Sequence, residues 1–163
     1  MTAGVVKTQG THLYFANPTS SDPELVKLAC PTGISGLGGA RDQIDVTCLD
    51  NTEDREYLPG LGNPGQVSIP FNFIPSHISH QVLFDLKEGG EVIDFIICLS
   101  DGTAQPTING QGVITPPVLR TSFEFRGFVQ DVNIDMATND KVTGTLTVQR
   151  SGKVKPNWQG PTP

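Results

Sequence analysis

The chain has 163 residues, of which 18 are glycine and 13 are proline, whereas a chain of this length has on average about 20 of the two together. The excess excludes a protein built from long helices, and the length fits one domain with a sizeable core. The net charge of −6 provides no basic surface for holding nucleic acid, and the longest uninterrupted apolar run, residues 95–99, is far too short for a membrane-spanning helix.

Alternation of apolar and polar residues predicts about seven β-strands. In the N-terminal half the candidates are residues 13–16, 24–29, 44–49 and 66–73. Every second residue of the last segment is apolar, which predicts a strand with one buried face. Pro70 lacks a backbone N–H, which places either the strand at the edge of a sheet or the proline on a side that forms no ladder hydrogen bond.

One helix is predicted at residues 76–88. Ser76 can cap its first turn, and Gly89 and Gly90 follow its last turn. Its apolar side chains share one face: Ile78, Val82, Leu83 and Leu86. The helix is therefore expected to lie on the surface of the β structure with this face buried.

The C-terminal half continues with three strands. Residues 91–99 are apolar in both phases, which predicts a strand covered on both faces. Residues 118–135 change phase partway, and a one-residue slip at Gly127 predicts a β-bulge that bends a long strand. Residues 142–149 present valine and leucine on one face and a threonine-rich row on the other.

Long loops separate these elements, at residues 31–39, 50–65 and 101–117. Loops of this length are uncommon unless they are functional or disordered. Leu58 and Leu61 make the second loop more apolar than a solvated linker, so we expect them to contact another subunit.

The predicted fold is mainly β, an antiparallel two-sheet β-sandwich or barrel with one short flanking α-helix and long loops. We predict a single domain over residues 1–163. It has an N-terminal arm at 1–10, the β structure at 11–149 and a C-terminal arm at 150–163.

No set of residues predicts catalysis, a cofactor or a metal site. His77 and His80 are three residues apart, but no third ligand completes a zinc pattern, and two surface histidines are the expectation. Cys48 and Cys98 have apolar neighbours, as small core residues do, and three widely spaced cysteines favour a reducing compartment. The glycines of residues 33–39 lack the spacing of a phosphate-binding loop. We therefore predict that the protein is not an enzyme.

Six carboxylates lie within residues 42–56, opposed only by Arg55. The calcium-loop pattern is absent, so this is either a solvated acidic loop or a contact surface for a basic partner. The C-terminal arm supplies a basic partner, and we expect the two segments to meet between identical subunits. The contact candidates are Asp50, Glu53, Asp54 and Glu56 with Arg150, Lys153 and Lys155.

Trp158 lies in the C-terminal arm among prolines that keep the chain extended. Tryptophan is enriched at binding hot spots. We therefore keep two alternatives: Trp158 docks onto a neighbouring subunit, or it belongs to a disordered end.

The order of these parts resembles the tail tube proteins of phages with long, non-contractile tails. The resemblance covers the short arm before Thr11-His-Leu-Tyr-Phe, the long loop 50–65, and the lone helix followed by a buried strand. It also covers Thr121-Ser-Phe-Glu-Phe-Arg-Gly-Phe-Val at the bend and the closing segment Val142-Thr-Gly-Thr-Leu-Thr-Val.

This resemblance implies a structural virion protein, made in the host cytoplasm, that polymerises as stacked hexameric rings. The rings form the conduit for genome ejection. The implied partners are further copies of the chain, a tape measure protein, a tail terminator, and distal tail or baseplate proteins. Two alternatives stay open: the tube protein of a contractile injection or secretion system, and an isolated β-sandwich that binds carbohydrate.

A tube of this kind would need an inner wall that does not hold DNA. One lysine per subunit facing the lumen of a hexameric ring would give about six phosphate contacts, enough for strongly salt-dependent binding. We therefore predict that polar strand faces line the lumen and that DNA passes without specific binding. The lumen candidates are Glu124, Thr143, Thr145, Thr147 and Gln149.

Overall fold

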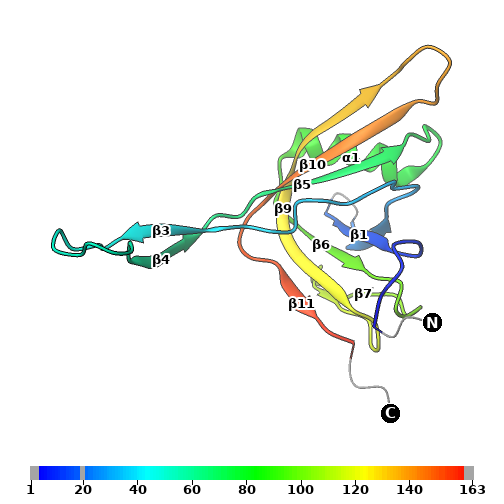
Figure 1. Ribbon diagram of the computed structural model, residues 1–163. Helices are drawn as coiled ribbons and strands as arrows, with labels where there is room; N and C mark the ends of the chain where they lie inside the picture. The colour runs from blue at the N-terminus through cyan, green and yellow to red at the C-terminus, as the bar shows by residue number, and fades with distance from the viewer. Residues whose placement is uncertain (1–3, 19–20, 160–163) are drawn as a thin grey trace.

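The computed structural model describes residues 4–18 and 21–159, and these contain eleven strands and one helix (Figure 1). In chain order the elements are β1 (His12–Asn17), β2 (Glu24–Lys27), β3 (Arg41–Asp45), β4 (Tyr57–Gly62), β5 (Gln66–Asn72), α1 (Ile78–Gly89), β6 (Ile93–Cys98), β7 (Thr107–Ile108), β8 (Ile114–Thr115), β9 (Ser122–Asp135), β10 (Thr143–Arg150) and β11 (Lys155–Asn157). All strand pairs are antiparallel, so the predicted mainly β, antiparallel fold with one short helix is confirmed.

One seven-stranded sheet forms the body. Its order is β2-β1-β6-β9-β10-β5, and β11 also pairs with β9. The main core contains side chains from both halves of this sheet, such as Phe15 and Phe95 from one half and Ile69 and Leu146 from the other. The sheet curves around this core without closing into a barrel, and of the two predicted forms the structure is therefore sandwich-like (Figure 1).

The outer edge of β5 is covered by a segment that follows β2. Residues 30–35 run beside β5 and exchange backbone hydrogen bonds with it, including one from the Thr32 N–H to the Pro70 carbonyl at 2.8 Å. Pro70 lies in the last strand of the sheet order, which is the first of the two predicted placements. Gly36 follows with a φ of 95°, and a Cβ there would overlap the carbonyl oxygen of Gln66. Only glycine fits where the chain leaves the body.

β9 connects the two halves of the sheet, because its first part pairs with β6 and its second part with β10. Val129 and Val132 are both buried, whereas Gln130 and Asp131 between them are both exposed. The register with β10 shifts at this point. An extra residue therefore lies at Gln130, and such a bulge increases the local bend of a strand.

The predicted change of phase in this strand is confirmed, but its predicted position at Gly127 is wrong. Gly127 is regularly paired with Ile93 on one side and Arg150 on the other. The misplacement comes from Phe128, which is half-buried and lies on the face away from the main core. Because it is aromatic, the alternation pattern counts it as a core residue.

The helix packs one face into the core through Val82, Leu83 and Leu86. It starts two residues later than predicted, and the N-cap is His77 instead of Ser76. Ile78 was expected on the buried face but is 62% exposed. At the C-terminus, the predicted glycine stop is confirmed: Gly90 has a φ of 66°, and its N–H bonds to the Leu86 carbonyl at 3.0 Å.

His80 is fully buried, so the prediction of two surface histidines is wrong for this residue. Its Nδ1 accepts the Ile74 N–H at 2.9 Å, which leaves the proton on Nε2, and Nε2 donates to the Ala29 carbonyl at 2.8 Å. Both ring nitrogens are satisfied, and a neutral imidazole is stable in the core under this condition. The contact fixes α1 to the segment that follows β2.

A second apolar cluster lies on the other face of β1 and β6. The β7–β8 hairpin covers it, with Ile114 packed against Tyr14 and Ile96. β6 is therefore buried on both faces, as predicted. The hairpin lies inside residues 101–117, which were expected to lack secondary structure.

The predicted loop 50–65 is also wrong, because β4 lies within it and pairs with β3. The predicted strand at 44–49 starts and ends earlier, at Arg41–Asp45. Figure 1 shows the β3–β4 hairpin projecting far from the body. Neither strand contributes a residue to the two buried clusters.

Candidate assembly surfaces

The β3–β4 hairpin exposes apolar side chains that its own chain does not cover. Ile44 pairs with Leu58 in the hairpin register, and these side chains are 52% and 53% exposed. The large exposed apolar residues of this segment are Ile44, Val46, Leu49, Tyr57, Leu58 and Leu61. An isolated two-stranded hairpin is marginally stable in water, so the exposed apolar side chains of this segment form a candidate contact surface.

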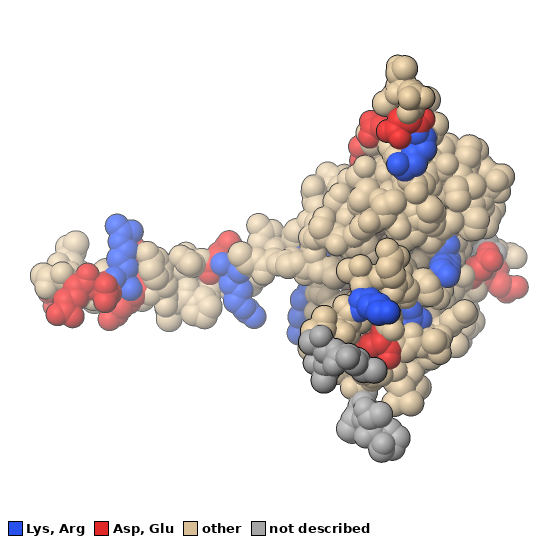
Figure 2. Space-filling view, turned by 45° about the vertical axis from the view of Figure 1, so that its right-hand side comes forward, with Lys and Arg blue, Asp and Glu red and all other residues tan. Residues whose placement is uncertain are grey.

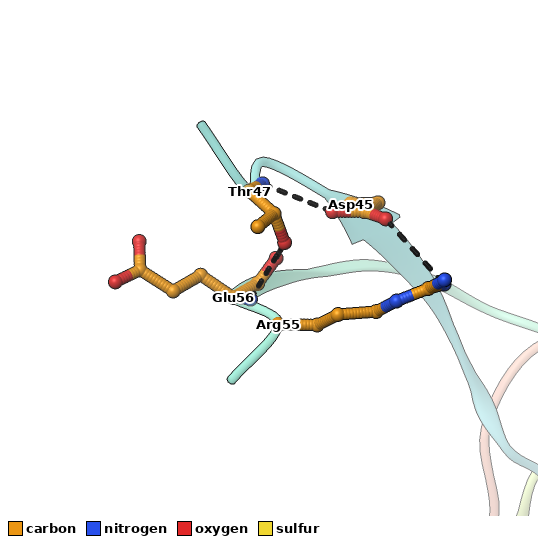
Figure 3. Close-up of polar contacts among 4 residues, drawn as sticks. All are labelled: Asp45, Thr47, Arg55 and Glu56. Carbon is orange, nitrogen blue, oxygen red and sulfur yellow. Dashed lines mark hydrogen bonds and ion pairs between the residues drawn. The ribbon is translucent and has the colours of Figure 1, made fainter. Parts of the chain in front are cut away.

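Polar contacts shape the tip of the hairpin, residues 46–56 (Figure 3). The Thr47 N–H donates to Asp45 Oδ1 at 2.9 Å, and the Glu56 N–H donates to Thr47 Oγ1 at 2.8 Å. Hydrogen bonds from Thr47 hold the pKa of Asp45 below its ordinary value. Arg55 lies 4.0 Å from the other Asp45 oxygen. These contacts define the conformation that the tip would present to a partner.

The tip carries the predicted acidic surface. Figure 2 shows acidic side chains gathered at the far end of the projection. Four of them are exposed and form no ion pair within 4.0 Å with any residue that the structure describes: Asp50, Glu53, Asp54 and Glu56. Leu58 and Leu61, the predicted contact leucines, lie farther along β4 on the same hairpin.

Arg150 lies at the base of the hairpin and not on the surface. It is 4% exposed, and its guanidinium donates to the Gly38 carbonyl. A Cβ on Gly39 would lie 3.0 Å from that guanidinium, so the glycine leaves room for the arginine. Of the three predicted basic contact residues, Arg150 thus anchors the hairpin, and only Lys153 and Lys155 are exposed.

The described part of the C-terminal arm lies along the body. Residues 155–157 pair with the start of β9 as β11, a short strand that the sequence analysis did not predict within the extended arm. Trp158 stands edge-on to Phe123, with ring centroids 6.2 Å apart, and remains 72% exposed. The Gln159 side chain donates to the Asp101 carbonyl at 3.0 Å. The last four residues, 160–163, lie outside the described chain.

The face of β5, β10 and the second part of β9 that points away from the main core is polar. β10 supplies four of the predicted lumen residues, all half-buried: Thr143, Thr145, Thr147 and Gln149. Thr147 lies between Ser68 and Asp131 in the sheet. The outward side chains of these strands include no lysine or arginine, although Lys87 of α1 reaches Asp131 at 3.2 Å.

Glu124, the fifth predicted lumen residue, is not in this group. It lies on the first part of β9, where it is paired with Lys155 of β11 and accepts a hydrogen bond from Asn157 Nδ2 at 3.0 Å. The structure thus brings the four β10 residues together and separates Glu124 from them.

Arg120 is a functional residue that the sequence analysis missed. It is 2% exposed, and its guanidinium donates to the carbonyls of Leu99 at 2.6 Å, Ala104 at 2.7 Å and Gly10 at 3.1 Å. These carbonyls belong to three separate segments, one of which is the N-terminal arm. Arg120 therefore holds the described part of this arm against the body.

His12 completes the Arg120 site. Its Nδ1 lies 3.2 Å from an arginine nitrogen, which can only donate, so His12 accepts and is neutral. Burial lowers the pKa of His12, and the nearby charges of Lys27 and Arg120 lower it further.

The cysteines differ from one another in exposure. Cys98 is buried, and burial raises the pKa of its thiol to about 11. Cys48 was expected in the core but is exposed at the hairpin tip, and Cys30 is exposed as well. Among the described residues no group of three histidine, cysteine or acidic side chains is placed to hold a metal ion. Within the same part of the chain, no helix has the length and apolar character needed to cross a membrane.

A projecting hairpin with exposed apolar side chains and an acidic tip, on a body with one polar face whose strands turn no lysine or arginine outward, is typical of a protein that assembles with other chains. The sequence matches the family described as phage tail tube, TTP, lambda-like, over residues 4–160. It is 35% identical over 153 residues to Structural protein 3 of Pseudomonas phage PAJU2, with 91% of this chain and 92% of that protein covered. The chain belongs to the lambda-like phage tail tube family.

Two solved structures show the same fold. The tail tube protein of phage SPP1 has a TM-score of 0.66 at 10% identity, with 94% of this chain and 79% of that chain covered. A tail protein of an empty gene transfer agent particle, in a structure with C6 symmetry, has a TM-score of 0.62 at 16% identity, with coverage of 90% and 96%.

Family membership decides between the hypotheses that the sequence left open. The chain is a structural protein of the phage tail, and its place is in the virion. The carbohydrate-binding alternative finds no support in these comparisons.

The burial of His12 beside Lys27 and Arg120 predicts a pH dependence of stability. Because the pKa of His12 is lowered in the folded state, the unfolded chain binds a proton near pH 6.5 that the folded chain does not bind. The free energy of unfolding should therefore fall as the pH drops through 6.5, by no more than about 1.4 kcal/mol per pH unit for this one group.

Urea unfolding between pH 7.5 and 5.5 measures this dependence. His12→Gln keeps an acceptor for Arg120 but cannot titrate, so its unfolding free energy should vary less over this range. Identical pH profiles for the two proteins would contradict the assignment.

Proposed function

We propose that this chain polymerises as stacked hexameric rings and that the stack is the tube through which the phage genome leaves the particle. The observation that carries the proposal is the β3–β4 hairpin, which projects far from the body (Figure 1) and exposes large apolar side chains. Membership of the tail tube family supports a tube, and the C6 symmetry of the similar gene transfer agent tail supports six subunits per ring.

The polar face of β5, β10 and β9 suits the lumen. Passing DNA meets threonine, serine and glutamine side chains there, and these form no charge-assisted contacts with phosphate. The net charge of −6 also opposes adsorption of DNA. DNA therefore slides through without specific binding.

Contacts with other tail proteins are expected from the same family membership. A tube needs a protein that sets its length, a terminator at one end and distal tail or baseplate proteins at the other. We propose that this chain meets a tape measure protein in the lumen and these end proteins at the two ends of the stack.

Electron microscopy of the purified protein tests the assembly and the part that the hairpin has in it. The native chain should form rings with six subunits each, or tubes built from such rings. Leu58→Ser combined with Leu61→Ser should raise the protein concentration needed for assembly by at least about tenfold, because apolar burial of even one leucine exceeds 1.4 kcal/mol. Both leucines are exposed in the subunit, so the unfolding free energy should not change.

Ile78→Ser is the matched control, because Ile78 is equally apolar and 62% exposed but lies on α1. A native chain that stays monomeric under all conditions would overturn the proposed function. Unchanged assembly of the Leu58→Ser, Leu61→Ser variant would show that these hairpin side chains do not take part in assembly.

The lumen assignment predicts an effect of charge on genome ejection. Thr145→Lys would add six cations to each ring, enough for about six phosphate contacts. Tubes should form normally, and ejection of DNA from phage carrying this variant should be slower at low salt and recover as the salt concentration rises. Thr145→Gln adds length without charge and should eject at the native rate. Equal ejection by all three phages at low salt would place this face outside the lumen.

A further inference from the structure

A groove of about 320 Å³ lies on the outer face of the body, beside the β7–β8 hairpin and the start of the C-terminal arm. Val113 and Ile114 form its apolar side, and Lys153 and Lys155 form its basic side. Val113 is 54% exposed although it adjoins the second apolar cluster. The groove thus combines uncovered apolar surface with two cations.

The charges in the groove are only partly balanced by its own residues. Arg126 pairs with Asp94 at 2.8 Å, and Glu124 accepts the Asn157 amide at 3.0 Å. Lys153 and Lys155 have no carboxylate within 4.0 Å among the residues that the structure describes. The groove therefore offers two exposed ammonium groups to an acidic partner.

The tip of the β3–β4 hairpin has the complementary character. It presents four carboxylates without ion pairs among the described residues, and Leu49, directly before Asp50, is fully exposed. Its internal hydrogen bonds define the conformation in which it would dock (Figure 3).

The tip does not reach the groove of its own subunit. The hairpin projects from the body in the direction away from β7 and β11 (Figure 1). A contact between tip and groove therefore joins two copies of the chain through two different surfaces. Such a heterologous contact produces closed rings or open helical stacks instead of two-fold dimers.

We propose that the hairpin tip of one copy, residues 46–56, occupies the groove formed by Val113, Ile114, Lys153 and Lys155 of the next copy. This rests on the proposed tube function and names the surface that receives the hairpin. Each exposed ion pair is weak, but the contact recurs in every subunit of the tube.

Charge reversal with rescue tests the pairing. Lys153→Glu combined with Lys155→Glu should raise the concentration needed for assembly at least tenfold, and most strongly at low ionic strength. Adding Glu53→Lys and Glu56→Lys to the same chain should restore assembly. Lys87→Glu with Lys141→Glu changes the net charge equally on exposed sites outside the groove and should assemble like the native chain.

Disulfide trapping locates the contact independently of charge. Cys48 is a native thiol at the tip, and Cys30→Ser removes the other exposed thiol. With Val113→Cys in this background, mild oxidation of the tube with copper phenanthroline should link subunits into covalent ladders through position 48. Val118→Cys, which is 78% exposed outside the groove, should not form them.

The results separate the two claims. If the native chain forms tubes and the lysine variants also assemble normally, the tip-to-groove contact is overturned and the tube function stands. Disulfide trapping at Val118→Cys and not at Val113→Cys would have the same meaning. Loss of assembly without rescue and without trapping at position 113 would assign the groove to a different segment and overturn the contact as well. A native chain that forms no tubes would instead overturn the proposed function.

Discussion

A two-stranded hairpin surrounded by water gains too little from its own backbone hydrogen bonds to be stable alone, and in this protein the β3–β4 hairpin is such an element. Its side chains are almost all exposed, and neither of its strands contributes a residue to the two buried apolar clusters. This uncovered surface is the constraint on which the assembly depends. In the proposed tube, this apolar surface of the subunit is buried by another copy.

The body is built to hold its extensions in place. Arg150 reaches from the end of β10 to the Gly38 carbonyl at the base of the hairpin, and Arg120 gathers carbonyls from three segments that include the N-terminal arm. His80 fixes the segment that leads from β2 toward the hairpin. Each contact joins a buried polar side chain to a backbone carbonyl of another segment, which gives a fixed direction to a segment that has little core of its own.

The sequence predicts the body well, because the body buries its own apolar residues. Alternation in β5 and β10 and the continuous apolar run of β6 follow directly from which faces are covered. The hairpin does not alternate, since β4 contains a proline and two glycines, and its strands were therefore misplaced or missed. Cys48 was assigned to the core because its sequence neighbours are apolar, but in the subunit Cys48 is exposed.

Other features have no signal in the sequence. Nothing near Arg120 marks it as buried, because its acceptors come from segments that only the fold brings together. His80 has the same spacing from His77 as a surface pair would have, and only the carbonyl of Ala29 and the amide of Ile74 make its burial possible. The groove beside Lys153 likewise depends on the β7–β8 hairpin, whose two-residue strands are too short for alternation to be recognised.

Hydrogen exchange of the hairpin amides, measured on the free subunit and on the assembled tube, tests the central claim most directly. If the hairpin is stabilised by other copies, residues 41–62 should exchange fast in the subunit and become strongly protected in the tube, while the strands of the body are protected in both. Equal protection of residues 41–62 in the two states would contradict the account, because the hairpin would then be stable without a partner.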